Sequence, residues 1–151
     1  MYKVIGESIK SAISVKLGEI FGKDAIRYKE AITDIQYPNF FIYQVSVSSD
    51  KVSNKIRNLN YLINIRYRYV EDINTVTDLE QKLDEVGFML ATEFTDIKLD
   101  RIKRVTNARY EKVDGVLQFF CNLNIRVTEE AEEEVKMQYL DLLEKLKKEE
   151  N

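Results

Sequence analysis

Few residues in this chain could carry out acid–base, nucleophilic or metal chemistry. Its 151 residues include no histidine and one cysteine, Cys121. Histidine is the commonest general base and metal ligand, so sites that depend on histidine are excluded. Zinc sites made of cysteine sulfur need several cysteines and are excluded as well. No Asp-x-Asp-x-Asp-Gly loop is present to bind calcium. We therefore expect no metal centre, no cofactor and no enzymatic activity.

The glycines, the acidic run and the lone thiol do not change this expectation. The five glycines are never spaced as in a phosphate-binding loop. The carboxylates of residues 129–134 could be proposed as an acid and a base, but acidic residues at the start of a predicted helix are explained by the helix dipole. Cys121 is expected to be a small buried apolar residue. One thiol cannot form an internal disulfide, which agrees with a chain kept in a reducing cytosol.

Charge is unevenly distributed along the chain. The net charge is −3, and residues 128–151 hold nine acidic residues against four lysines, which leaves −5 there and +2 in the remainder. Residues 51–70 contain five basic residues and no acid. Such a chain can meet copies of itself or a partner by charge complementarity. The apolar runs are far too short to cross a bilayer, so we expect no membrane contact.

The hydrophobic pattern predicts an α+β fold in which helices flank an antiparallel or mixed sheet. A helix is expected over residues 3–22, ending at Gly22, and a second helix from a Thr77–Glu80 capping box to about Phe94. An acidic helix is expected over residues 128–151, on or beyond a domain of residues 1–127. Strands are expected over residues 25–30, 39–47, 59–69, 102–112 and 117–127. The predicted order is α-β-β-β-α-β-β-α, with helices on one face of the sheet.

Finer predictions concern the strand faces and their connections. Alternation from Leu59 to Tyr69 and from Leu117 to Val127 predicts one apolar and one polar face. In the strand over residues 39–47, one face is expected to carry Phe41, Tyr43, Val45 and Val47. Residues 48–58 are polar without a period and are interpreted as a long hairpin loop. The Asp114-Gly115 pair predicts a tight hairpin turn.

Binding of single-stranded nucleic acid is one function that the residue types on the predicted strands could support. Basic residues and tyrosines alternate on the predicted strands, as in a stacking platform: Arg66, Arg68, Lys103, Arg104, Arg109 and Arg126, with Tyr67, Tyr69 and Tyr110. The tyrosines of the third strand, however, share its apolar face and are expected in the core. The sequence pI of about 5.2 is also low for a nucleic-acid-binding domain.

Three segments resemble a known family when their order and spacing are taken together. They are Tyr28-Lys29-Glu30 followed by Tyr37-Pro38-Asn39-Phe40-Phe41-Ile42; Asn54-Lys55-Ile56-Arg57-Asn58 followed by Leu62-Ile63-Asn64-Ile65-Arg66-Tyr67; and Tyr110-Glu111-Lys112-Val113-Asp114-Gly115-Val116-Leu117-Gln118-Phe119-Phe120. The chain is similar here to phage tail terminators of contractile-tailed phages, PBSX-type prophages and phage-tail-like bacteriocins. The likeness spans about residues 5–127. Asn39 and Gln118 depart from the family pattern, where a small residue or cysteine and a histidine are common.

The resemblance implies a structural protein of the virion or bacteriocin particle, located at the junction of tail and neck. It implies a hexameric ring that caps the tail tube, stops addition of tube and sheath, and offers a surface to the head or neck; DNA would at most pass through its lumen. Another neck or head-completion protein is the nearest alternative. The motif residues expected to be structural are Tyr28, Glu30, Pro38, Phe40, Phe41, Asp114 and Gly115. The residues expected to contact neighbouring subunits or the tube are Lys51, Asn54, Lys55, Arg57, Arg66 and Arg68.

Overall fold

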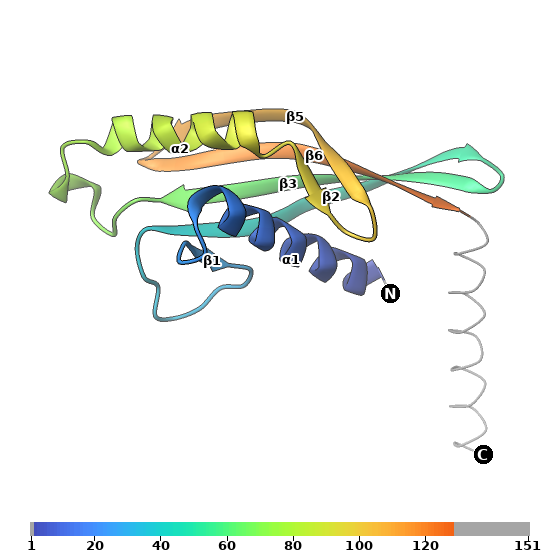
Figure 1. The fold of residues 1–151 in the computed structure, drawn as a ribbon, viewed down its shortest axis with the longest axis horizontal. Helices are drawn as coiled ribbons and strands as arrows, with labels where there is room; N and C mark the ends of the chain where they lie inside the picture. Colours follow the sequence, from blue (N-terminus) through green and yellow to red (C-terminus); the bar gives the residue numbers. More distant parts are fainter. Residues whose placement is uncertain (1, 129–151) are drawn as a thin grey trace, which may run out of the picture.

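The computed structural model describes residues 2–128, with side chains from residue 8 onward, and has one layer of helices on one layer of sheet (Figure 1). Its elements are α1 (Tyr2–Phe21), β1 (Ile26–Tyr28), β2 (Asn39–Ser53), β3 (Ile56–Arg68), the 3-10 helix η1 (Ile73–Thr75), α2 (Leu79–Glu93), β4 (Asp96–Lys98), β5 (Ile102–Val113) and β6 (Val116–Thr128). The six strands form one sheet in the order β1-β2-β3-β6-β5-β4. The β1–β2 pair is parallel, and the other four pairs are antiparallel.

The predicted α+β class is confirmed, as is the order of elements that the sequence pattern indicated up to β6. The short strand β4 is an addition, because three residues are too few to show a period. The acidic helix expected over residues 128–151 lies outside the described residues.

Both helices cover the same face of the sheet. Alternate residues of β3 and β6 are buried on that face, as their patterns predicted: Leu59, Tyr61, Ile63, Ile65 and Tyr67, with Leu117, Phe119, Cys121 and Leu123. The helices contribute one apolar stripe each: Ile9, Ile13 and Leu17 from α1, with Leu83, Val86 and Leu90 from α2. All of these side chains belong to one hydrophobic cluster, so a single core lies between the two layers.

The ends of the helices agree only partly with prediction. Gly22 follows α1 with φ +104° and its N–H donates to the Gly18 carbonyl at 2.9 Å, which confirms the predicted stop. The capping box before α2 is wrong, because Asp78 is the N-cap and its side chain makes no capping hydrogen bond. Glu80 instead accepts from the Lys112 ammonium of β5 at 2.7 Å. The Glu80 carboxylate, which the capping box required, therefore forms an ion pair with the neighbouring strand instead.

The turn between β5 and β6 is the predicted one. Asp114 has φ 50° and Gly115 has φ 75°, and Val113 pairs with Val116 across them. Two consecutive positive φ values are what a two-residue hairpin turn of this hand requires. A Cβ added to Gly115 would lie 2.7 Å from Cγ2 of Ile73, so the close approach of η1 is a second reason for glycine here.

The prediction for the faces of β2 is wrong beyond Tyr43. Phe41 and Tyr43 lie opposite Arg66 and Asn64, on the face turned away from the helices. The register then shifts at Val45, which leaves Val47 opposite Tyr61 on the other face. A bulge inserts one residue into the strand and so reverses the alternation, and nothing in the side-chain pattern announces it.

The long loop predicted over residues 48–58 is also wrong. β2 continues to Ser53 and β3 begins at Ile56, so the connection is the two residues Asn54 and Lys55. The segment has no hydrophobic period because both of its faces meet water, and every residue of β2 from Gln44 onward is exposed. The turn also lacks the glycine and the positive φ values that mark the Asp114-Gly115 turn.

Candidate assembly surfaces

One end of the sheet is a three-stranded extension, called the ribbon below: residues 46–53 of β2, 56–62 of β3 and 122–128 of β6. At its base Asn60 pairs with Ser48 on one side and Asn124 on the other. At its tip Ile56 pairs with Ser53 and with Thr128. Figure 1 shows the β2–β3 hairpin reaching past both helices at one end of the molecule. The base of the ribbon still contributes Leu59, Tyr61 and Leu123 to the core, and its outer part extends beyond the helices.

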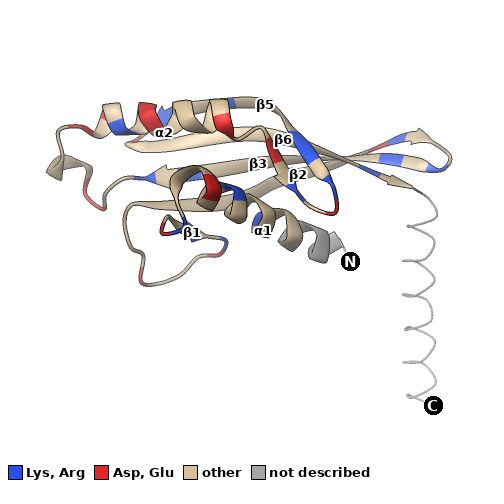
Figure 2. Cartoon of the chain, in the orientation of Figure 1, with Lys and Arg blue, Asp and Glu red and all other residues tan. Residues whose placement is uncertain are grey.

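Four of the six predicted interface residues lie at the tip of the ribbon. Lys51 and Arg57 are cross-strand partners, and Asn54 and Lys55 form the turn. The Arg57 guanidinium donates to the Ser49 hydroxyl at 3.4 Å. Figure 2 shows the lysines and arginines gathered at this end of the hairpin. All four residues are exposed, so the tip presents positive charge to solvent.

The other two predicted interface residues are in a different place. Arg66 and Arg68 lie at the far end of β3, about 30 Å from Arg57 at roughly 3.3 Å per residue. Arg66 pairs with Phe41 on the face turned away from the helices, called the open face below. Arg57, in contrast, belongs to the alternating set of β3 that faces the helices farther along the strand. The structure therefore divides the predicted interface into two separate surfaces.

The open face carries a row of stacked rings and guanidinium groups. The ring of Phe41 lies 5.1 Å from that of Tyr28 and 5.9 Å from that of Tyr43, the latter pair nearly parallel at 19°. The guanidinium of Arg66 lies 4.6 Å from the centre of the Tyr43 ring, and that of Arg68 lies 5.9 Å from that of Phe41. On the same face Arg109 covers Phe120 at 5.3 Å. Cation–π contacts of this kind hold the arginines flat against the sheet.

Asn64 fixes the position of Arg66 and is a buried side chain on the predicted polar face of β3. It is 1% exposed. Its amide donates to the Phe119 carbonyl at 3.2 Å, and its Oδ1 accepts from Nε of Arg66 at 2.8 Å. The alternation in β3 correctly placed Asn64 on the open face, but it gave no sign that Arg66 would cover it.

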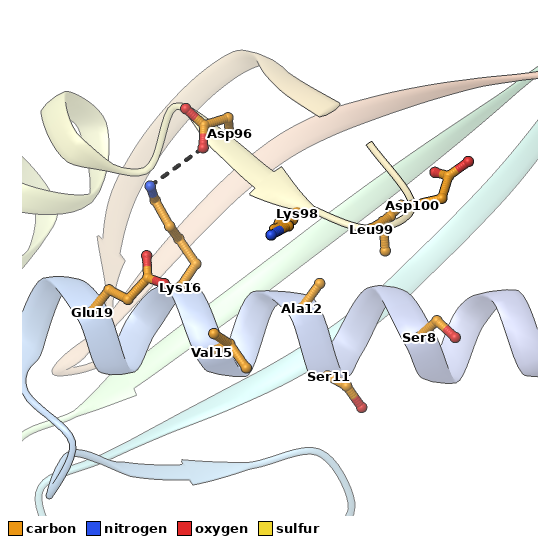
Figure 3. A pocket seen from close by; sticks show the side chains of 10 residues that line it. All are labelled: Ser8, Ser11, Ala12, Val15, Lys16, Glu19, Asp96, Lys98, Leu99 and Asp100. Atoms are coloured by element: carbon orange, nitrogen blue, oxygen red, sulfur yellow. Dashed lines mark hydrogen bonds and ion pairs between the residues drawn. The ribbon is translucent and has the colours of Figure 1, made fainter. Parts of the chain in front are cut away.

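A groove of about 730 Å³ lies elsewhere, between α1 and the segment around β4 (Figure 3). An ion pair between Lys16 and Asp96, 3.4 Å apart, spans one end of it. The remaining lining residues are Ser8, Ser11, Ala12, Val15, Glu19, Lys98, Leu99 and Asp100. This lining mixes charges of both signs with small side chains and contains no nucleophile beside a base. Among the described residues there is also no group of three or more potential metal ligands.

Comparison with known proteins identifies the family of the chain. A family model described as phage tail terminator protein matches residues 8–135, well over half of the chain. The chain belongs to this phage tail terminator family. The match confirms the resemblance carried by the three sequence segments. No curated protein matches the chain.

Membership gives the chain a structural role in completing the phage tail. The residues matched by the family model include the core sheet, both helices' buried stripes and the whole ribbon, so the exposed surfaces above belong to the terminator domain itself. No described helix of this terminator is both long enough and apolar enough to cross a bilayer.

The residues that carried the resemblance mostly hold the terminator fold together. Phe40 is buried, and its ring contacts both α1 and β3. The hydroxyl of Tyr28 accepts a hydrogen bond from the backbone of the loop before β2, and Pro38 in that loop follows a cis peptide bond. Phe41 anchors the stacked row on the open face, and Glu30 is exposed just after β1. Within the chain, Phe40, Tyr28 and Phe41 therefore make packing or hydrogen-bonding contacts, whereas Glu30 is exposed.

Two buried groups of the terminator have altered pKa values, and both belong to the core. Burial raises the pKa of the Cys121 thiol to about 12, against a small opposing effect of Arg109. Burial also raises the pKa of the Tyr67 hydroxyl to about 12. Each group remains protonated at neutral pH. The predicted role of Cys121 as a buried apolar side chain is confirmed by its 1% exposure.

Proposed function

We propose that this terminator forms a ring, most simply a hexamer, that caps the tube of a contractile phage tail or a headless bacteriocin. The ring ends addition of tube and sheath protein and presents a surface to the neck or head. Assembly takes place in the bacterial cytoplasm, and DNA has no role beyond passing through the lumen. The family match over residues 8–135 is the observation that carries this proposal.

The two exposed surfaces support a ring of identical subunits. Head-to-tail contacts in a closed ring need two different, complementary patches on each copy. The tip of the ribbon, with Lys51 and Arg57, and the open face, with Arg66 and Arg68, are separate patches of one sheet. Both are basic, so each is expected to meet a different, non-basic surface of a neighbouring subunit or of the tube. We assign contacts with neighbouring subunits or the tube to these patches. The acidic residues 128–151 are assigned to the periphery, where they meet sheath or adjacent subunits.

Electron microscopy of the purified protein, alone and mixed with its tail tube protein, tests this function. Closed rings seated on tube ends are the expected result. A monomer that stays inert in both samples would refute the capping role. Rings that do not bind tubes but do bind the head connector would favour the alternative of a neck-completion protein.

A charge-reversal variant tests the assignment of the ribbon tip. Lys55→Glu with Arg57→Glu should abolish attachment to tubes while leaving the monomer folded, because both side chains are exposed and lie far from the core. Lys23→Glu with Arg101→Glu is the matched control, since it makes the same charge change at exposed positions away from the ribbon. Normal capping by the ribbon variant would remove this surface from the interface.

Binding of single-stranded nucleic acid is retained as a second candidate on one observation. The open face presents Tyr43 and Phe120 with arginines against their rings, whereas Tyr67 of the predicted platform is in the core. Stacking platforms combine these residue types and bind in a strongly salt-dependent way. Titration with a labelled oligonucleotide at two salt concentrations tests it, and the absence of binding at low salt would reject it.

A further inference from the structure

The ribbon has two open strand edges at the same level along its length. β1 pairs with β2 only over Asn39 to Phe41, and β5 pairs with β6 only as far as Leu123. Within the part of the chain that the structure describes, the outer edges of β2 beyond Phe41 and of β6 beyond Leu123 have no strand beside them. The backbone groups on these edges are a template for a further strand.

The two edges differ from one another, and their charges are complementary in one row of side chains; Lys51, next to Asp50 on β2, belongs to the opposite face. Asp50 on β2, Asn58 on β3 and Arg126 on β6 form one row across the ribbon, since Asn58 is the register partner of both. Partners in a row project from the same face of a sheet. One edge of the row is therefore acidic and the other is basic. Both charged residues are exposed, and the described residues provide neither with an ion pair; Arg126 donates only to Asn58, at 3.4 Å.

We infer that neighbouring subunits of the ring pair these edges, with β2 of one copy lying beside β6 of the next to continue the sheet. This inference rests on the proposed ring. It identifies the occupant of the open edges as a second copy of this chain, because one edge is complementary to the other. When a copy is added without slip along the strands, its Asp50 comes to lie beside Arg126 of its neighbour.

The direction of the strands agrees with cyclic assembly. β2 and β6 both run antiparallel to β3, so they run parallel to each other. Where the strands run along the ring axis, rotation about that axis keeps all ribbon tips pointing the same way, and the new β6–β2 contact is then parallel. A two-fold dimer would instead pair like edges, β2 with β2, in antiparallel fashion. That arrangement would place Asp50 of one subunit near Asp50 of the other or leave both without a partner. It would also leave the β6 edge of each subunit open.

The shape of β2 also suits such a contact. Residues 46–51 pair with β3 in unbroken register between bulges at Val45 and Val52. This regular stretch spans about 20 Å. The apolar side chains along it and at its ends, Val45, Val47 and Val52, are 53%, 43% and 49% exposed. A neighbouring strand would cover part of this apolar surface as well as the backbone.

Reversing one charge at a time gives a test with an intermolecular rescue. Asp50→Arg alone makes both edges basic, and Arg126→Asp alone makes both edges acidic, so each variant should form few rings. Each interface is expected to weaken on the order of tenfold, because a favourable cross-strand pair becomes a like-charge pair. An equimolar mixture of the two variants should restore rings, since alternating copies regain Asp–Arg contacts at every interface. Restoration cannot come from within one chain, where β3 separates the two positions.

The controls distinguish failure of the inference from failure of the function. Asp24→Arg and Arg101→Asp make the same charge changes at exposed sites off the ribbon and should leave rings intact. Circular dichroism confirms folding, and Asp50→Lys with Arg126→Glu provides a second pair if a first variant folds poorly. Rings by wild type and by both single variants, or no rescue in the mixture, would overturn edge pairing alone. Absence of wild-type rings, with or without tubes, would overturn the proposed function and the inference together.

Discussion

Replacement of Asn64 by alanine should destabilise the monomer far more than its position on a polar strand face implies. Asn64 is 1% exposed and makes two hydrogen bonds, one to the Phe119 carbonyl and one from the Arg66 guanidinium. A neutral hydrogen bond contributes about 1 kcal/mol to stability, and one to a charged group about 1.5–3 kcal/mol. Because Arg66 is half-exposed and regains water, we expect a loss of about 2–3 kcal/mol in the free energy of unfolding.

Asn60→Ala is the matched control. Asn60 lies on the same face of β3 and is half-buried, and its Oδ1 accepts from the Asn122 amide at 3.3 Å. Loss of this single neutral hydrogen bond should cost about 0.5–1 kcal/mol. The pair therefore differs in burial and in the contact with Arg66, while the chemical change is the same.

Urea unfolding at protein concentrations too low for ring formation measures both variants. With slopes of about 1–3 kcal/mol/M, the midpoint for Asn64→Ala should fall by on the order of 1 M relative to wild type, and clearly below that of Asn60→Ala. A double-mutant cycle of Asn64→Ala with Arg66→Ala should show that the two losses are not additive. Equal midpoints for Asn64→Ala and Asn60→Ala would refute the structural role of the buried amide.

The remaining predictions concern two glycines with positive φ, the Cys121 thiol and the Tyr67 hydroxyl. Gly22→Ala should lower the free energy of unfolding by about 1–2 kcal/mol, because alanine is strained at a positive φ. Gly115→Ala should lower it further, because its Cβ would also contact Ile73. Urea unfolding midpoints compare the two variants, and equal losses of stability would contradict the close contact with Ile73. The Cys121 thiol should resist a thiol reagent at pH 8 until urea unfolds the chain, and rapid labelling of folded protein would contradict its burial. Cys121 and Tyr67, both with pKa values raised to about 12, keep their protons in the folded state after the unfolded chain has lost them. Stability should therefore fall as pH rises from about 9 toward 12, and Cys121→Ala should make that fall less steep in urea titrations.

The elements that could be predicted from the sequence are those that touch the core. The alternation from Leu59 to Tyr67 in β3 was readable because one face of the strand is buried against the helices. The Asp114-Gly115 turn was readable because its φ values restrict the residue types that can occupy it. In each case one physical requirement leaves a trace in residue type or spacing.

The surfaces were harder to predict because water imposes no period. Residues 48–58 of the ribbon looked like a loop, since every residue of β2 from Gln44 onward is exposed and the turn at Asn54 and Lys55 uses no glycine. The bulge at Val45 reversed the faces of β2 without changing its composition. The stacking of Arg66 on Tyr43 depends on cross-strand register, which a single strand's pattern does not contain.

The exposed ribbon makes physical sense as part of an assembly and is difficult to account for in an isolated monomer. Open strand edges favour uncontrolled pairing, and proteins usually shorten, cover or charge them. Here the bulges at Val45 and Val52 limit the regular edge of β2, and Asp50 and Lys51 place opposite charges on alternate faces within it. Those features oppose indiscriminate stacking but still permit one partner strand with a basic residue in the matching row. A terminator that must stay soluble until it meets its neighbours needs that combination, and the mixed-variant rescue tests whether Asp50 and Arg126 provide it.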